Sequence, residues 1–321
     1  MSDRLSIKHT VLVFGSINMD LVAKASRLPV PGETLLGRDF FTVPGGKGAN
    51  QAVAIARLGV ATKMVGRVGG DSFGGELINS LQTSGVQTEH VLVDQAAGSG
   101  VALIAVDDGG ENQIIIVPGA NGRVNEADVE RLQGLLLGAY AILLQFEIPI
   151  QAVLSAAQAA RRAGVRVILD PAPAHLDVPS ELYPLVDIIT PNEVEAGQLV
   201  GFPVDGLEAA ESAASVLRQR GVGSVIVKLG ARGALCATGS ETFLIPAFPV
   251  QAVDTVAAGD AFNGGLATAL AEGLSLRQAV VWGAAAGAIA STKQGAQSSM
   301  CDRDTFNKFL SERETPTGYS R

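Results

Sequence analysis

The sequence predicts an α/β fold, a three-layer α/β/α sandwich in which a mainly parallel central sheet lies between two layers of helices. Short apolar runs, rich in β-branched residues, alternate along the chain with longer segments of helical periodicity. The apolar runs are continuous, which is typical of strands buried on both faces. Alternation of this kind favours right-handed crossovers between parallel strands, and such folds bind ligands at the carboxyl ends of their strands.

The predicted elements follow one another in a regular order. The strands are the apolar runs Thr10 to Phe14, Ala139 to Phe146, Val165 to Asp170, Asp187 to Thr190 and Ser224 to Lys228. The helices are the periodic segments Gln151 to Ala163, Leu207 to Arg220, Gly259 to Glu272 and Leu276 to Ser291. No internal repeat, charge block or low-complexity linker divides the chain, so residues 1–321 are expected to form one domain.

Two stretches depart from this order, Met19 to Val43 and Gly98 to Val117. Apolar and polar residues alternate there, and Pro-Gly and Asp-Gly-Gly turns interrupt the runs. A period of two with such turns predicts antiparallel strands. These strands form either a small sheet of their own or an ordinary hairpin at the edge of the main sheet.

Composition limits the classes of function. Only 17% of the residues are charged and 38 are glycine, which suits a large buried sheet with many tight turns. The formal net charge of −8 argues against a nucleic-acid-binding surface. It does not exclude a phosphate ligand, because local dipoles and metal ions can hold ATP in an acidic protein.

Cysteine usage and apolar stretches point to the cytoplasm. Cys236 and Cys301 stand far apart without CxxC spacing, so neither a disulfide framework nor a zinc site is expected. The first ten residues are polar and do not resemble a signal peptide. The longest apolar stretches, Leu135 to Ile150 and Ala279 to Ala290, are too short or too interrupted to span a membrane.

A segment near the carboxyl end has the features of a phosphoryl-transfer site. Two carboxylates, Asp254 and Asp260, flank a turn of small residues that leads into a helix. Small side chains let backbone N–H groups approach a phosphate, the helix N-terminus adds a positive end, and Asp260 could accept a proton from an attacking hydroxyl. Taken alone, the same pattern also fits a helix capped by Asp260.

A second glycine-rich segment, Gly45 to Asn50, also opens a helix, and Gly59 is its natural stop. It is not a Walker A loop, because Phe41 stands where the first glycine belongs and Gly48 replaces the Ser or Thr that binds magnesium. The chain has no Gly-x-Gly-x-x-Gly, so a nicotinamide enzyme of the usual kind is not expected. The histidines lie outside all these segments, at positions 9, 90 and 175.

Together these segments identify a family by resemblance. Gly45 to Asn50 and Asp254 to Asp260 resemble the two signatures of the ribokinase-like (PfkB) carbohydrate kinases, and Gly15 to Asp20 matches a third segment in the expected order. Ala257 stands where many relatives carry Gly, and at this position the chain resembles the ribose-kinase branch of the family. The resemblance covers almost the whole chain, and it implies that the stretches 19–43 and 98–117 form a small β-sheet lid.

The resemblance implies a sugar site from three parts of the chain. The residues that match sugar-contacting positions are Asn18, Asp20, Gly46, Lys47, Asn50, Glu147 and Asp260. Their chemistry agrees, because amides and carboxylates can fix several hydroxyls of a polyol. Glu147 would also be an unusual charge to leave at a strand end without a partner. Lys47 alone would be read as a solvated lysine at a helix start.

The resemblance also implies a nucleotide site. Asn192 would reach the phosphates and Glu195 would organise water around Mg²⁺, although a capping box predicts the same spacing. A segment that resembles the one flanking ATP comprises Lys228, Leu229, Gly230, Ala231, Arg232 and Gly233. Its glycines would admit the backbone to the nucleotide. Lys228 occupies a position often filled by Thr, and its side chain has no assigned role.

A K⁺ site is implied beside the phosphate turn. Its ligands would be the Asp254 carboxylate, the carbonyls of Val256, Ala290, Lys293 and Gly295, and the Ser299 hydroxyl. Hard cations prefer such oxygens. On the residues alone, Asp254 could instead cap the turn and the later loop could be surface.

The expected activity is ATP-dependent phosphorylation of the 5-hydroxyl of D-ribose, with Asp260 as base and the amides of Ala257, Ala258 and Gly259 stabilising charge. Mg²⁺ and K⁺ are the expected metals, and a homodimer through the lid is the expected assembly. The alternatives are a kinase for deoxyribose, another furanose or a nucleoside, and a sensor without turnover. Intact Asp260, Gly259 and Glu195 count against the sensor.

Overall fold

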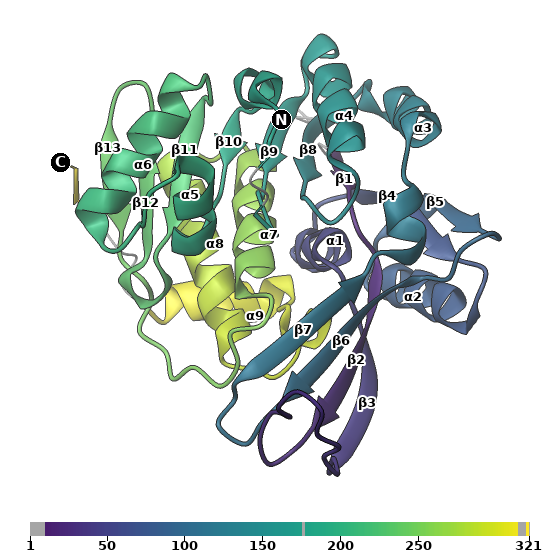
Figure 1. Cartoon of the computed structure of the whole chain (residues 1–321). Coiled ribbons are helices and arrows are strands. Elements are labelled where there is room, and N and C mark those ends of the chain that lie inside the picture. Colours follow the sequence, from purple (N-terminus) through teal and green to yellow (C-terminus); the bar gives the residue numbers. More distant parts are fainter. Residues whose placement is uncertain (1–9, 175–176, 314–318, 321) are drawn as a thin grey trace.

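The computed structural model describes residues 10–174, 177–313 and 319–320, so His9 and His175 lie outside the described residues. Its elements form two sheets and surrounding helices (Figure 1). The strands of the larger sheet are β1 Thr10–Phe14, β4 Thr62–Gly69, β5 Gln87–Asp94, β8 Ala139–Leu144, β9 Arg166–Leu169, β10 Ile188–Ile189, β11 Ser224–Lys228, β12 Ala234–Ala237, β13 Thr242–Ile245 and β14 Tyr319–Ser320.

The larger sheet is mainly parallel. Over the described residues its order is β14-β13-β12-β11-β10-β9-β8-β1-β4-β5. From β5 to β11 every neighbouring pair is parallel, while β11 to β14 pair antiparallel at one edge. The predicted parallel sheet is therefore confirmed, and the antiparallel edge is a feature that the sequence analysis did not predict.

Helices cover both faces of this sheet. Their bounds are α1 Lys47–Arg57, α2 Ser72–Thr83, α3 Glu126–Leu136, α4 Ile150–Arg162, α5 Glu193–Val200, α6 Leu207–Gln219, α7 Ala258–Ala271, α8 Leu276–Ser291 and α9 Arg303–Ser311. Short 3₁₀ turns are η1 Gly119–Arg123, η2 Ser180–Leu185, η3 Gly230–Arg232 and η4 Gln297–Ser299. The predicted helices are confirmed within one residue at each end.

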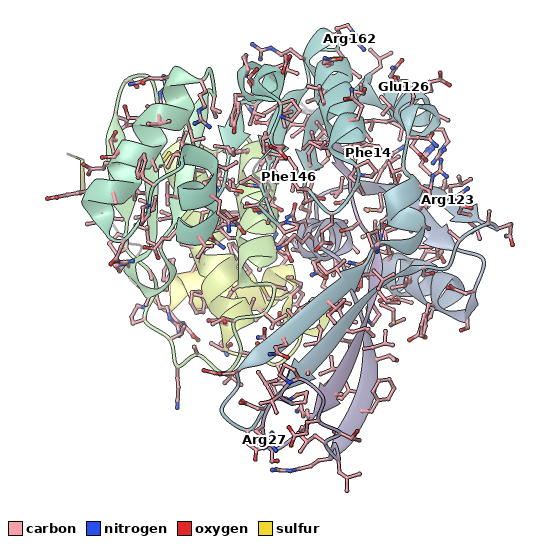
Figure 2. All side chains as sticks on the ribbon, viewed as in Figure 1. Phe14, Arg27, Arg123, Glu126, Phe146 and Arg162 are labelled. Carbon is pink, nitrogen blue, oxygen red and sulfur yellow. The ribbon has the colours of Figure 1, made fainter. Side chains whose placement is uncertain are left out.

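Two apolar cores explain the three layers. Side chains of a strand point alternately to opposite faces, so Leu12 and Phe14 of β1 pack in the core under α3 to α6. Val11 and Val13 pack in the core under α1, α2, α7, α8 and α9. Figure 2 labels Phe14 and Phe146, which both belong to the core under α3 to α6. The α/β/α sandwich follows from strands that are apolar on both faces.

The smaller sheet extends away from the sandwich (Figure 1). Its strands are β2 Asn18–Lys24, β3 Asp39–Gly45, β6 Gly100–Val106 and β7 Asn112–Val117, in the order β3-β2-β6-β7. β2 pairs antiparallel with β3 and parallel with β6, and β6 pairs antiparallel with β7. The two irregular stretches of the sequence therefore build a separate sheet, with Arg27 at its far end (Figure 2).

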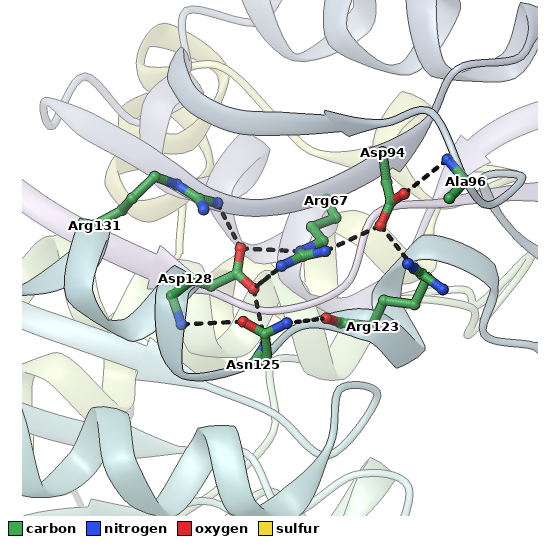
Figure 3. A network of polar contacts seen from close by, with 8 residues as sticks. Arg67, Asp94, Ala96, Arg123, Asn125, Asp128 and Arg131 are labelled. Carbon is green, nitrogen blue, oxygen red and sulfur yellow. Dashed lines mark hydrogen bonds and ion pairs between the residues drawn. The ribbon is translucent and has the colours of Figure 1, made fainter.

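A buried ion network joins the larger sheet to α3 (Figure 3). The Arg67 guanidinium on β4 donates to the carboxylates of Asp94 on β5 and Asp128 on α3. All three side chains are at most 9% exposed. Asp128 also closes a capping box with Asn125, and this fixes the segment that contains η1. From η1, the buried Asn121 bonds both backbone groups of Ile17, just before β2.

Candidate active site

The predicted site residues meet at the carboxyl ends of the parallel strands. The chain leaves β1 and enters β2 at Asn18, Glu147 follows β8, and Lys228 ends β11. The first turns of α1 and α7 approach the same place, because Asn50 of α1 contacts Asp260 of α7. The position agrees with the rule for ligand sites in open α/β sheets.

Asn18 and Glu147 are held as a polar pair. The Asn18 Nδ2 donates to Glu147 Oε2 at 3.3 Å, while its Oδ1 accepts from Asn121 Nδ2 at 2.7 Å. Ser16 Oγ and the backbone N of Lys47 also donate to Glu147 Oε2. Glu147 therefore has the partners that a charge at a strand end requires.

Close backbone contact brings α1 to this pair. Gly46 precedes the helix with φ of 87°, and a Cβ built there would lie 2.7 Å from the Asn18 N. Gly48 is equally constrained, since its Cβ would lie 2.7 Å from the Ser16 N. The glycines of this segment are needed for the approach of two backbones, in addition to opening a helix.

Asp260 is buried, and two amides hold its carboxylate. Asn50 Nδ2 donates to Oδ2 at 3.0 Å and Gln51 Nε2 donates to Oδ1 at 3.0 Å. Burial raises the pKa of Asp260, with the Asp170 carboxylate acting in the same direction and Lys47 acting against it. The interpretation of Asp260 as a helix cap is wrong, because Ala257 is the N-cap of α7 and Asp260 lies in its first turn.

Like charges and burial shift the other groups of the site. Burial raises the pKa of Asp20 to about 7, and the charges of Glu147 and Asp260 add to the shift. Burial also raises the pKa of Glu147, although Lys47 opposes it. For Lys47, burial disfavours the charge, yet the carboxylates around it raise its pKa above the ordinary value. Clustered titrating groups of this kind are typical of functional sites.

The N-terminus of α7 is arranged to receive an anion. Ala257 has φ of 57°, the one positive value at a non-glycine position among the described residues, and no side chain caps the helix there. A strained residue at such a position is typical of a functional turn. The amides of Ala258 and Gly259 begin the helix, so its positive end faces the site.

In the part of the site that the sequence predicted to bind the nucleotide, Asn192 and Glu195 form the capping box that their spacing also predicted. Asn192 Oδ1 accepts from the Glu195 N, and Glu195 Oε2 accepts from the Asn192 N, both at 2.8 Å. Burial raises the pKa of Glu195, and the Lys228 charge opposes this. The backbone N of Lys228 donates to the Pro191 carbonyl at 2.8 Å, so the two segments lie side by side.

The segment after β11 divides into different environments. Leu229 is buried in the core, so only its backbone can face a nucleotide. Gly230 and Gly233 have positive φ, and Ala231 is exposed between them. The Arg232 guanidinium pairs with Glu193, the residue after Asn192.

The loops proposed to hold K⁺ are in contact. Asp254 Oδ1 accepts from the Val256 N and its Oδ2 accepts from the Gly295 N, both at 2.9 Å. The Ser299 hydroxyl donates to the Ala296 carbonyl, which leaves its oxygen lone pairs available. The amide of Lys293 bonds the Ala290 carbonyl. Carboxylate, carbonyl and hydroxyl oxygens are the types of ligand that a hard cation prefers.

A Mg²⁺ ion would need only one or two carboxylates from the protein at this site. Among the described residues, no group of three or more His, Cys, Asp or Glu side chains is arranged to hold a metal. Mg²⁺ in kinases usually takes one or two carboxylates and completes its shell with water and substrate phosphates. The Glu195 carboxylate, which accepts from the Asn192 N through one oxygen, is a group of this kind.

Sequence reasoning missed three buried residues that organise the site. Asp170 follows β9 and bonds both Lys228 Nζ, at 3.0 Å, and Gln51 Nε2, at 2.9 Å. Gln51 in turn accepts from Gln145 Nε2 at 2.6 Å. A polar residue at the end of an apolar strand is a usable signal for Asp170 and Gln145. Gln51 gives no such signal, because it lies among the ordinary residues of a helix.

Known proteins resemble this chain in sequence and in fold. The family description "pfkB family carbohydrate kinase" matches residues 8–303. A ribokinase of Haemophilus influenzae is 42% identical, covering 95% of this chain and 99% of that protein. A deoxyribokinase of Salmonella typhi is 36% identical over the same shares. An Arabidopsis thaliana ribokinase complexed with ribose and ATP has a TM-score of 0.85 at 35% identity, covering 94% of this chain and 98% of that one.

Proposed function

The chain belongs to the pfkB family of carbohydrate kinases, and we propose that it transfers the γ-phosphoryl group of ATP to the 5-hydroxyl of D-ribose. The observation that carries this proposal is the Asp260 carboxylate, held by Asn50 and Gln51 beside the uncapped N-terminus of α7. The relative complexed with ribose and ATP has the same fold over almost its whole length.

In the proposed reaction, Asp260 orients the sugar hydroxyl and receives its proton. The hydroxyl oxygen bonds to the γ-phosphorus, the bond from that phosphorus to the β–γ bridging oxygen breaks, and ADP leaves. The transition state is loose, so a carboxylate that accepts the proton late is sufficient. The amides of Ala257, Ala258 and Gly259 stabilise charge on the moving phosphoryl group.

The proposed sugar contacts come from the smaller sheet and from α1. Asn18 and Asp20 belong to the smaller sheet, while Lys47 and Asn50 begin α1. The buried Asn50 Oδ1 has no hydrogen-bond partner among the residues that the structure describes, which supports its use as an acceptor for a sugar hydroxyl. Gly46 keeps this turn close to Asn18, and Glu147 fixes the Asn18 amide.

We propose two metal roles for the groups described above. Mg²⁺ would neutralise charge on the ATP phosphates, with Glu195 and Asn192 on the nucleotide side. K⁺ would bind the Asp254 carboxylate, the carbonyls of Val256, Ala290, Lys293 and Gly295, and the Ser299 hydroxyl. The contact between Asp254 and Gly295 supports this, because it already joins the two loops.

We also propose one kinase domain that acts as a cytoplasmic homodimer, joined through the lid insertions at about 19–43 and 98–117. The support is the apolar surface of the smaller sheet, where Leu103 and Ile115 lie opposite each other on β6 and β7 and are 43% and 64% exposed. Such a surface is typical of a protein contact. No helix within the described residues is long and apolar enough to cross a membrane.

The experiment is a coupled ADP-release assay with ribose, 2-deoxyribose, fructose and adenosine at fixed Mg-ATP. Ribose should give the largest kcat/KM, and ³¹P NMR should identify a 5-phosphate ester as the product. Deoxyribose in first place would favour the second candidate, which the deoxyribokinase relative supports. No sugar-dependent ADP release from folded protein would reject the proposed function.

A further inference from the structure

The proposed reaction assigns no role to the side chain of Lys228. Its ammonium pairs with Asp170 Oδ1 at 3.0 Å, and the two side chains are 14% and 2% exposed. A buried pair of this kind carries a desolvation cost, so it is weak evidence for a purely stabilising role. The position of the ammonium gives it another use.

The Lys228 ammonium lies over the first turn of α7. A Cβ built at Gly259 would be 3.2 Å from Lys228 Nζ, so the ammonium and the Gly259 backbone are neighbours. Gly259 has no Cβ and so leaves room for the ammonium, which a larger residue would crowd. The positive end of α7 and the charge of Lys228 therefore face one position.

The same position borders the nucleotide side of the site. The backbone of Lys228 pairs with Asn192 in an isolated bridge. Asp170 binds Lys228 through one oxygen and Gln51 through the other, and Gln51 binds Asp260. The ammonium and the Asp260 carboxylate are thus held at the two ends of one hydrogen-bonded chain. One end offers a cation to a phosphate group, and the other offers an acceptor to a sugar hydroxyl.

We propose that the Lys228 ammonium contacts the γ-phosphoryl oxygens of ATP and stabilises their charge during transfer, while Asp170 positions it. This inference rests on the proposed kinase function. Lys228 remains protonated throughout, and the hydroxyl proton passes only to Asp260. A fixed cation in a water-poor site stabilises a moving negative charge more strongly than the same cation in water.

The test compares ligands that differ by the γ-phosphoryl group. Lys228→Met removes the charge and keeps much of the side-chain length, Lys228→Arg keeps the charge, and Lys308→Met on the exposed face of α9 is the matched control. Calorimetry with Mg²⁺ should show that Lys228→Met weakens binding of a non-hydrolysable ATP analogue at least about tenfold and ADP binding far less. Its kcat should fall about 10²-fold, as for other lost transition-state donors, with Lys228→Arg less affected.

Equal losses of analogue and ADP affinity in folded Lys228→Met, or a kcat close to that of the wild type, would overturn the assignment. If that variant does not fold, the double variant Lys228→Met/Asp170→Asn removes the unpaired buried carboxylate and allows the same comparison. The binding comparison needs no sugar. Failure of the sugar assay in the wild type would therefore reject the proposed function without deciding the role of Lys228.

Discussion

Asp260 shows how single residues make a buried carboxylate usable. Burial alone would favour its neutral form, which could not accept a proton. The amides of Asn50 and Gln51 each donate to one oxygen and lower the pKa again, as does Lys47. The pKa of Asp260 stays raised overall because burial outweighs these contacts, and the two carboxylate oxygens are fixed in direction and poorly hydrated, as a positioned base requires.

Asp20 makes the stability of the protein depend on pH. The unfolded chain loses the Asp20 proton near the ordinary pKa of 3.8, whereas the folded protein holds it up to about 7. Between these values the folded state binds the extra proton. The stabilising contribution of protonated Asp20 is therefore complete below about pH 4 and is lost as the pH rises through about 7, about 4 kcal/mol at most.

Asp20→Asn should accordingly raise the melting temperature relative to the wild type, and the gain should be larger at pH 8 than at pH 5. The amide keeps the shape and removes repulsion from Glu147 and Asp260. Asp39→Asn, an exposed site on β3, is the control and should show no such pH dependence. A gain that is the same at both pH values would contradict the raised pKa of Asp20.

At the scale of elements, α1 depends on one backbone approach. Gly46→Ala should destabilise the protein by about 1–3 kcal/mol, because the new Cβ would meet the Asn18 N at a positive φ. Ribose affinity should fall as well, since Asn18 must move. Gly75→Ala is the matched control, because a Cβ built there would meet no described residue within 4 Å outside its own helix α2. Chemical denaturation and ribose titration would measure both effects, and a Gly46→Ala protein as stable as the control would contradict the role of this turn.

The loop that follows α8 should bind K⁺ together with the turn before α7. K⁺ should raise kcat severalfold over Na⁺ at constant ionic strength, because a bound cation would fix the turn before α7 and add positive charge there. Asp254→Ala should remove the difference, whereas Asp304→Ala on α9 should retain it. Initial rates in K⁺, Cs⁺ and Na⁺ at saturating Mg-ATP and ribose measure this. If all three rates coincide in the wild type, the cation site does not exist.

Local sequence patterns predicted the elements with the strongest local signals, namely five strands buried on both faces and four long periodic helices. β1, β11 and α8 begin and end where the sequence analysis placed them. The strands β4, β5 and β12 to β14 of the larger sheet were not predicted. Of these, β12 to β14 are short strands at an antiparallel edge, which resemble loops in a single sequence. The turn before α7 was identified as a site, but its N-cap was not, because a non-glycine residue at positive φ is unusual.

Residues whose roles depend on distant contacts were the hardest to predict. Gln51 lies 119 positions from Asp170 and 209 from Asp260, and no spacing along the chain indicates those bonds. Asn121 likewise fixes Asn18 from 103 positions away. Such residues become visible only when the sheet order is known, because the fold alone brings these segments together.

At the scale of the whole molecule, the exposed apolar face of the smaller sheet predicts a homodimer. Light scattering at micromolar concentration should give twice the mass of 32.9 kDa. Ile115→Glu should produce monomers, because a charge would be buried in the contact. Leu137→Glu is the matched control, since Leu137 is 96% exposed outside the lid. An active wild-type monomer would remove the dimer proposal and leave the sugar site unaffected.

We propose above all that Asp260 of α7, bonded by Asn50 and Gln51 of α1, accepts the proton of the sugar hydroxyl. The most direct measurement is kcat of Asp260→Asn with ribose, taken together with its melting temperature and its ATP affinity. The variant should fold and bind ATP normally, while kcat falls about 10²–10⁴-fold, because the amide keeps the shape without the proton acceptor. A folded Asp260→Asn enzyme with a kcat near that of the wild type would contradict the account.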